Sequence, residues 1–514
     1  MYKLLLCWRY LRTRYIALAS IISVMLGVAT MIVVNSVMQG FGQEMQDRIH
    51  SMYSDLIFRS VTLDGMADPE RHEAQIRKVA GDQIEGMSPI VMTEAILNFQ
   101  SHGMSIVRQV SLVGIDEKTQ SLVSGFGRYL QHPANRDPAT ITFDLRRGGY
   151  DTRDRQSGPE APERKDMRDA GWVNRERMAR ESEFRQEYEN RRKKPVAAPA
   201  DDPFGKRADP FAPRGIPGGG AGTVFDRATQ QNTGIVLGIA LACFRTSDGQ
   251  DRFSILPGDD VKLTFPTNGQ PPKAVSDDFT VVDFYESKMA EADGKMVFVP
   301  IRKLQELRGM IDPSTGVGFV NAIQIKLKPG VDGDAVRNKL QAAFPCDRYS
   351  VCTWRDMQSN LLNAVEMEIT VLNILLFFII AVAGFGILAI FYMIVVEKTR
   401  DIGILKSLGA SRRGVMGIFL GYGLSLGLVG SGVGMVAGLL FVRYINEIAG
   451  LVGWLRGRPV FDPSVYYFYK IPAVVMPETV FWVVVGALMI AVAASILPAR
   501  RAARLHPVEA LRYE

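Results

Sequence analysis

Charged side chains are absent from four long stretches of this 514-residue chain, which are Tyr15–Val34, Ile369–Val396, Gly414–Val442 and Thr479–Ala499. About 20 apolar residues are enough for a helix to cross a bilayer, and a buried core helix is seldom so long without a charge. The sequence therefore predicts four transmembrane helices. The missing charges also argue against an ion-driven transporter or a proton relay, because both need ionisable groups inside the membrane.

Catalytic motifs are also missing. The sequence contains no GxxxxGK[ST] phosphate loop and no HExxH, and its five histidines are scattered. We therefore predict no catalytic residue, no metal site and no cofactor bound by this chain. Any energy from ATP would have to come from a partner protein.

Cysteine is scarce, with Cys7, Cys243, Cys346 and Cys352 only. Their spacing does not match a metal site. Cys346 and Cys352 are six residues apart in a region expected outside the cytoplasm, so a local disulfide and two unpaired thiols both stay open.

Basic residues cluster beside the apolar stretches, and the net charge is +6. By the positive-inside rule these clusters place both termini and the loop 397–413 in the cytoplasm, and the large region 38–367 on the opposite side of the membrane. A nucleic-acid role is the weaker interpretation, because the clusters flank the predicted spans. The first stretch is too long for a usual signal-peptide core, so we expect an uncleaved anchor. The basic residues are Lys3, Arg9, Arg12, Arg14, Lys398, Arg400, Lys406, Arg412, Arg413, Arg500, Arg501, Arg504 and Arg512.

The predicted organisation follows from these spans. It comprises a cytoplasmic segment 1–14, a first span 15–37, a periplasmic domain 38–367, a second span 368–396, a cytoplasmic loop 397–413, a third span 414–442, a periplasmic loop 443–478, a fourth span 479–499 and a cytoplasmic tail 500–514.

The region 38–367 has the pattern of an α+β domain. A strand at 55–61, a helix at 69–80 and strands at 87–99 and 105–114 begin it, and a strand at 321–327, a helix at 332–344 and a strand at 349–354 end it. Together these predict a split ferredoxin-like βαββαβ unit with an inserted subdomain. In the insert we expect a short helix at Gly234–Ala242, strands at 261–265, 279–285 and 296–300, and a helix at 301–307.

Residues 133–225 differ in composition. Seven of the ten residues 185–194 are charged, and 195–217 contain six prolines. Such a segment buries too little apolar surface to offset its ordering entropy, so we predict a largely disordered insertion with a charged helix at 168–194. A partner-binding arm is the alternative.

Glycine is frequent in the third span, with several residues four apart, which lets helix backbones approach closely. We predict that this row packs on a second copy or a paralogue, with packing inside one subunit as the alternative. The row consists of Gly423, Gly427, Gly430, Gly434 and Gly438.

The loop EKTRDIGILKSLGASRR, residues 397–413, has a helical pattern. Ile402, Leu405 and Leu408 recur at spacings of three, and Gly409 with Ala410 suits a helix C-terminus. A short amphipathic helix between two spans is suited to dock in a groove of a cytosolic partner.

One span, a large external domain and three more spans make an arrangement that resembles the MacB/FtsX-type (type VII) ABC transporter permeases. The segment EKTRDIGILKSLGASRRGVMGIFLGYG resembles the coupling-helix signature of that family. The tail PVEALRYE and the stretch TWRDMQSNLLNAVEMEITVLNILLFFIIAVAGF resemble the lipoprotein-releasing branch, LolC/LolE. By this resemblance, contact with the ATPase is expected from Glu397, Ile402, Gly403, Ile404, Leu405, Lys406, Leu408, Gly409 and Ala410, and from Asp401, where the family often has Glu.

The resemblance implies two permease subunits and two copies of a separate ATPase, which binds ATP and Mg²⁺. ATP-driven closure would move the spans and the external domains, a process termed mechanotransmission, and extract a lipoprotein from the inner membrane. Membrane lipids and a periplasmic carrier are further implied partners, and nucleic acid is not one. The loop 266–278, where LolC-like proteins carry a docking hook, is short here, and we assign no docking residue.

Two alternatives remain. A MacB-like exporter would move peptides or small molecules, but MacB proteins carry an ATPase before the first span, where we expect only 14 residues. An FtsX-like signalling protein would activate a cell-wall hydrolase and transport nothing, but its external domain is usually much smaller.

Overall fold

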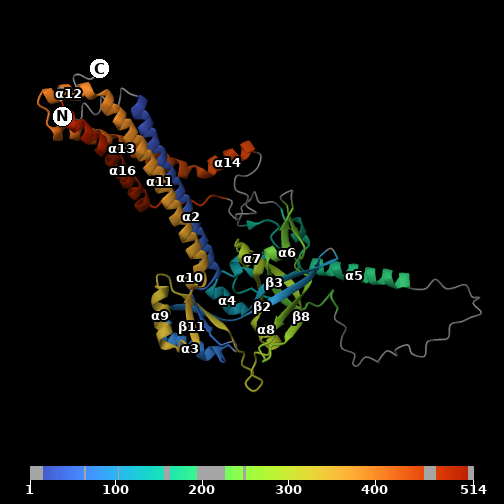
Figure 1. Ribbon diagram of the computed structural model, residues 1–514. Helices are drawn as coiled ribbons and strands as arrows, with labels where there is room; N and C mark the ends of the chain where they lie inside the picture. The colour runs from blue at the N-terminus through green and yellow to red at the C-terminus, as the bar shows by residue number, and fades with distance from the viewer. Residues whose placement is uncertain are drawn as a thin grey trace, which may run out of the picture. The chain divides into compact units, whose positions relative to one another are not determined.

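The protein is described by a computed structural model, which covers residues 15–62, 65–101, 103–155, 163–193, 226–246, 250–456 and 470–506 (Figure 1). The chain divides into two compact units. The helical unit comprises Met1–Asp47 and Gln358–Glu514, and the β-rich unit comprises Arg48–Met357. The tail PVEALRYE lies outside the described residues.

Four long helices dominate the helical unit, and each contains one of the charge-free stretches. All four are long and apolar enough to cross a membrane. Helix α16 packs against both α11 and α13, and glycines of α13 and α2 bring α2 close to α13 and α11. The four are α2 (Tyr15–Met52), α11 (Ser359–Glu397), α13 (Arg412–Arg443) and α16 (Pro477–Arg504), with the shorter α12 (Thr399–Ser407) and α14 (Ile445–Arg456) between them.

The glycine row of α13 packs inside the chain, so the prediction of a contact with a second copy is wrong in this structure. A Cβ on Gly427 would lie 3.0 Å from the Cβ of Ala491 on α16, and one on Gly434 would lie 2.7 Å from the carbonyl oxygen of Met25 on α2. The row winds around α13, and its two ends meet different helices. The five buried glycines are Gly423 and Gly427 towards α16, and Gly430, Gly434 and Gly438 towards α2.

A nine-stranded sheet organises the β-rich unit, in the order β11-β1-β10-β2-β3-β9-β4-β8-β7. Strand β7 also pairs with β2, so the six strands β2, β3, β9, β4, β8 and β7 close into a barrel. The strands are β1 (Leu56–Ser60), β2 (Ile84–Ser101), β3 (Met104–Ile115), β4 (Thr233–Gly238), β7 (Asp260–Pro266), β8 (Ala274–Tyr285), β9 (Met296–Pro300), β10 (Ala322–Leu327) and β11 (Tyr349–Thr353). The short strands β5 (Cys243–Arg245) and β6 (Asp251–Phe253) form a separate hairpin.

The strands β11, β1, β10 and β2 are antiparallel throughout, and helices α3 (Pro69–Ala80) and α9 (Gly333–Ala343) belong to this part. Phe58 of β1 is fully buried and contacts the rings of Phe344 and Tyr349. Strand β11 lies at the edge, where the side chain of Gln341 accepts a hydrogen bond from Val351 N (2.9 Å) and donates one to the carbonyl of Tyr349 (3.1 Å). This edge is therefore covered by a side chain of α9, which guards it against pairing with another chain.

The barrel interior holds the main apolar core, where Leu97, Leu112 and Val281 are fully buried. Residues Gly234–Gly238 belong to strand β4, so the helix predicted for Gly234–Ala242 is confined to α6 (Ile239–Ala242). Strand β4 lies between β8 and β9 and is buried from Gly234 to Gly238, which explains its lack of alternating polarity. The remaining helices are α4 (Glu117–Val123), α7 (Ala290–Lys295), α8 (Ile301–Arg308), α10 (Trp354–Met357) and the 3₁₀ turns η1 (Gly81–Gln83) and η2 (Gly127–Tyr129).

The first half of the insertion is folded, so the prediction of a largely disordered 133–225 is wrong for the described residues 133–155 and 163–184. Arg164 is 4% exposed and makes a two-pronged ion pair with Glu286 of the segment after β8, at 2.7 and 2.8 Å. Fully buried Arg175 donates to Asp260 at 2.7 Å and to the carbonyl of Gly258 at 3.1 Å. The insertion also contains η3 (Pro133–Asn135), η5 (Lys165–Asp169) and α5 (Trp172–Lys193).

Buried ion pairs hold this first half of the insertion in place. The amino-acid composition indicates too few apolar contacts for folding, but it does not reveal these pairs. Buried carboxylates and guanidinium groups are tolerated only when they are paired and hydrogen-bonded, as they are here. Residues 194–225, which carry the prolines, lie outside the described residues.

The cysteines described by the structure are free thiols. Cys346 is exposed in the turn before β11, and the Sγ of Cys352 in that strand lies 3.4 Å from the Oγ of Ser350. Of the two alternatives for Cys346 and Cys352, the structure has the unpaired thiols.

Candidate functional site

The candidate site is the short helix α12 between the two long helices α11 and α13. Helix α11 ends at Glu397, and the N–H of Lys398 still donates to the carbonyl of Ile394 at 2.9 Å. One non-helical residue, Lys398, therefore separates α11 from α12. The turn leaves α12 attached to the end of α11 by the shortest possible connection.

A glycine motif ends α12, as the sequence predicts. Gly409 has a φ of +94°, in the left-handed region where other residues are strained. Its N–H donates to the carbonyl of Lys406 (3.1 Å), and the N–H of Ala410 donates to that of Leu405 (3.0 Å), which is the Schellman pattern. Ser411 then caps α13 by accepting a hydrogen bond from Gly414 N at 3.1 Å.

The apolar residues of α12 point in different directions. Ile402 is 3% exposed and belongs to the core of the helical unit, whereas Leu408 is 80% exposed. Residues spaced by three turn back by about 60° at each step, so the first and last of this set lie roughly 120° apart around the helix. The predicted single face of Ile402, Leu405 and Leu408 is therefore wrong. The exposed apolar surface consists of Ile404 (43% exposed) and Leu408.

The other predicted contact residues divide in the same way. Gly403 is buried, and Asp401, Leu405, Lys406 and Ala410 are half-buried. The exposed members of the set are Glu397, Ile404, Leu408 and Gly409.

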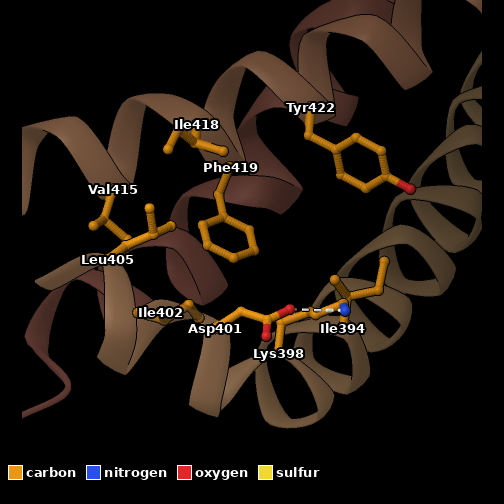
Figure 2. A pocket seen from close by; sticks show the side chains of 9 residues that line it. All are labelled: Ile394, Lys398, Asp401, Ile402, Leu405, Val415, Ile418, Phe419 and Tyr422. Atoms are coloured by element: carbon orange, nitrogen blue, oxygen red, sulfur yellow. Dashed lines mark hydrogen bonds and ion pairs between the residues drawn. The ribbon is translucent and has the colours of Figure 1, made fainter. Parts of the chain in front are cut away.

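A small apolar cavity lies beneath α12 (Figure 2). Leu405 of α12 and Phe419 of α13 point towards one another there, and the ion pair between Lys398 Nζ and Asp401 Oδ2 (2.8 Å) stands at its edge. Its volume is about 40 Å³, only a few times the space that one water needs. The cavity therefore has no room for a lipidated protein or a nucleotide. Its lining residues are Ile394, Lys398, Asp401, Ile402, Leu405, Val415, Ile418, Phe419 and Tyr422.

Lys406 connects α12 to the end of α16. Its Nζ donates to the carbonyl of Ala503 at 3.0 Å and also to that of Leu505. A cation at these carbonyls is favourable, because the last turn of a helix presents unpaired carbonyls and partial negative charge. Burial and the nearby charge of Arg412 lower the pKa of Lys406. The sequence predicts Lys406 at the partner contact and does not reveal this internal role. Lys406 and Ala503 are 97 positions apart, so no local sequence pattern connects them.

Exposed cationic side chains occur on α12 and at the start of α13. Arg400, Arg412 and Arg413 are exposed, while Arg501 lies over the ring of Tyr392 at 5.6 Å. Within the described ranges, His, Cys, Asp and Glu side chains form no group that could hold a metal ion. The exposed apolar side chains of Ile404 and Leu408, together with exposed arginines on α12 and α13, therefore suit a protein contact.

Two family models match the chain. The model described as "FtsX-like permease C-terminal" matches residues 373–507, which include α12, and the "MacB-like periplasmic core domain" matches residues 17–148. The lipoprotein-releasing system transmembrane protein LolC of Xylella fastidiosa is 32% identical over 236 residues, 46% of this chain and 55% of that protein.

Two further relatives are similar over comparable lengths. LolC of Neisseria meningitidis is 29% identical over 54% of this chain and 65% of its own length. The macrolide export ATP-binding/permease protein MacB of Bdellovibrio bacteriovorus is 26% identical over 39% of this chain and 29% of its own length. The matched region thus spans 55% and 65% of these two LolC proteins, less than two thirds of either.

Proposed function

Since this chain carries the FtsX-like and MacB-like domains of the MacB/FtsX-type ABC permeases, we propose that it is the permease subunit of a transporter that releases lipoproteins from the inner membrane. A separate ATPase would bind ATP and Mg²⁺, and a second permease copy or paralogue would complete the membrane part. The observation that carries the proposal is α12, an exposed two-residue apolar contact joined directly to two candidate membrane helices, inside the region that matches the FtsX-like model.

The orientation is part of the proposal. Basic residues of α12 and its flanks favour the cytoplasmic side under the positive-inside rule, which would leave both termini in the cytoplasm and Arg48–Met357 in the periplasm. The four-stranded part β11-β1-β10-β2 with α3 and α9 would be the split ferredoxin-like unit of that domain, which the sheet order supports. Lipoprotein cargo and a periplasmic carrier are proposed from the LolC relatives.

The relative named MacB supports a second candidate, an exporter of peptides or small molecules. An FtsX-like signalling role is the third. Neither would co-purify with an acylated lipoprotein, so the bound cargo separates them from lipoprotein release.

The test is a pull-down of the full chain from detergent, followed by identification of bound proteins and lipids. Wild type is compared with Leu408→Asp, which places a charge at the most exposed apolar position of α12, and with Val107→Asp, an equally drastic change on an exposed residue of the β-rich unit. We expect an ATPase and acylated lipoproteins with wild type and Val107→Asp, and loss of the ATPase with Leu408→Asp. An ATPase with a soluble hydrolase and no lipoprotein would favour signalling, and no ATPase with any variant would refute the ABC assignment.

A further inference from the structure

Asp55 is the centre of a hydrogen-bonded cluster in the β-rich unit. Its side chain is 14% exposed, and Oδ1 accepts a hydrogen bond from Nε2 of His50. Oδ2 accepts a second from the backbone N–H of Leu327 at 2.7 Å, and the Nζ of Lys326 lies 3.4 Å from the same oxygen. One carboxylate thus binds residues of two separate segments.

Trp354 adds a third segment to this cluster. Its backbone N–H donates to the carbonyl of Asp55 at 3.2 Å. Its indole stacks on the ring of His50, with centroids 5.1 Å apart and an angle of 23° between the planes, and the guanidinium of Arg355 lies 5.2 Å from the indole centroid. We call His50, Asp55, Lys326, Leu327 and Trp354 the Asp55 cluster.

The members of the Asp55 cluster occupy informative positions along the chain. His50 is in the last turn of α2 and ends the candidate membrane span Leu18–His50. Trp354 begins α10, and only Gln358 separates α10 from α11. The cluster therefore joins the incoming and outgoing connections of the β-rich unit to each other and to strand β10.

The bonds of the Asp55 cluster are of the strong kind. Hydrogen bonds to an ionised carboxylate are roughly twice as strong as neutral ones. Burial acts to raise the pKa of Asp55, but the hydrogen bond to His50, the N–H of Leu327 and the charge of Lys326 together lower it. Asp55 is therefore held in its ionised form, in which it binds all these partners at once.

Helix α11 runs without interruption from Ser359 to Glu397, and α12 follows after one residue. Its 39 residues span about 58 Å at 1.5 Å per residue. One continuous helix thus leads from the start of α12 to Gln358, the residue next to α10. Coupling between distant sites is carried by rigid elements and by hydrogen-bond networks.

We propose that the Asp55 cluster is the joint through which movement of α11 is passed to the sheet and to α2, so that both connections move as one body. The proposal rests on the proposed function, in which a partner ATPase drives α12. Asp55, His50 and Trp354 are positioning residues in this role and contact neither nucleotide nor cargo.

The variants remove single elements of the cluster. Asp55→Asn keeps the shape and removes the charge, and Trp354→Ala removes the stacked ring. Trp354→Phe keeps an aromatic ring and serves as the conservative variant. Asp82→Asn removes an exposed carboxylate of the same unit and is the matched control.

The first readout is amide hydrogen exchange of the full chain with its ATPase in nanodiscs. We expect Asp55→Asn and Trp354→Ala to raise exchange about tenfold or more in both connections, 49–56 and 353–359, because losing about 1.4 kcal/mol shifts an opening equilibrium tenfold. Trp354→Phe and Asp82→Asn should stay within about twofold of wild type. If hydrogen exchange rises in only one of the two connections, or in neither, the proposal is overturned.

The second readout is lipoprotein released per ATP hydrolysed. We expect Asp55→Asn and Trp354→Ala to keep the rate of ATP hydrolysis within about twofold and to lower release per ATP at least about fivefold, with Trp354→Phe close to wild type. An unchanged amount of lipoprotein released per ATP would overturn the proposal even if hydrogen exchange rises. A cluster with a merely structural role would not uncouple lipoprotein release from ATP hydrolysis. If wild type itself releases nothing, the proposed function fails, and the exchange data alone decide whether the connections are linked.

Discussion

Replacing Arg164 by Gln should destabilise the β-rich unit by about 3 kcal/mol or more. Arg164 is buried and pairs with Glu286 and with Asp251 at 3.1 Å, so its loss leaves buried carboxylates short of a partner. Removing one partner of a buried pair typically costs about 3–5 kcal/mol. Lys288, which also pairs with Glu286, places the expected loss at the lower end.

The pKa of Glu286 is shifted in the direction that this pairing predicts. Burial acts to raise this pKa, but the charge and hydrogen bonds of Arg164, and then those of Lys288, lower it from 4.5 to about 2. A lowered pKa in the folded state means that ionised Glu286 stabilises the folded state. Because the folded pKa is depressed, this stability is present above pH 4.5 and is lost as the pH falls towards 2. The gap between wild type and Arg164→Gln should therefore be larger at pH 7 than at pH 4.

The assay is urea unfolding of the full chain in detergent, followed by pulse proteolysis of the β-rich unit at both pH values. Arg168→Gln is the matched control, since Arg168 is 63% exposed and its pair with Glu163 is of the surface kind, worth about 0–1 kcal/mol. Equal effects of the two substitutions, or a gap that does not depend on pH, would refute the reasoning.

Two further predictions concern the helical unit. Gly434→Leu should destabilise the protein by about 1–3 kcal/mol and lower its melting temperature in detergent, because a Cβ there would meet the carbonyl of Met25 at 2.7 Å. Gly432→Leu is the control and should have little effect, because nothing lies within 4 Å of its Cβ. Equal melting temperatures of the two variants would contradict the packing of α13 on α2. Gly409→Ala should cost about 1–2 kcal/mol through its positive φ and weaken ATPase capture, measured as retained ATPase in a pull-down, whereas Gly450→Ala, with open space around it, should retain wild-type capture.

Much of the fold follows from local patterns in the sequence. The four long helices follow from charge-free runs bounded by basic residues, and helix α12 with its glycine end follows from Gly409 and the spacing of its apolar residues. Strands such as β1 and β10 alternate or are strongly apolar, and they appear within one or two residues of their predicted bounds.

The predictions that the structure contradicts share a physical cause, because each concerns residues whose partners lie far away in the sequence. Arg164 and Glu286 are 122 residues apart, so the charges that hold the insertion look like solvated ones in the sequence. Gly234 approaches the carbonyl of Phe143 so closely that no Cβ would fit, and this tertiary contact accompanies a strand where a helix was predicted. The glycine row of α13 could serve either a second copy or the same chain, and only the positions of α2 and α16 decide between them.

The central claim is that ATP hydrolysis by a partner, received at α12, releases lipoproteins. The most direct measurement is the amount of acylated lipoprotein that leaves proteoliposomes containing this chain, its partner ATPase and a soluble acceptor. We expect ATP-dependent release with wild type and Val107→Asp, and release reduced to the level without ATP for Leu408→Asp. Full release by Leu408→Asp would contradict the role of α12, and ATP hydrolysis without any release by wild type would contradict the proposed function.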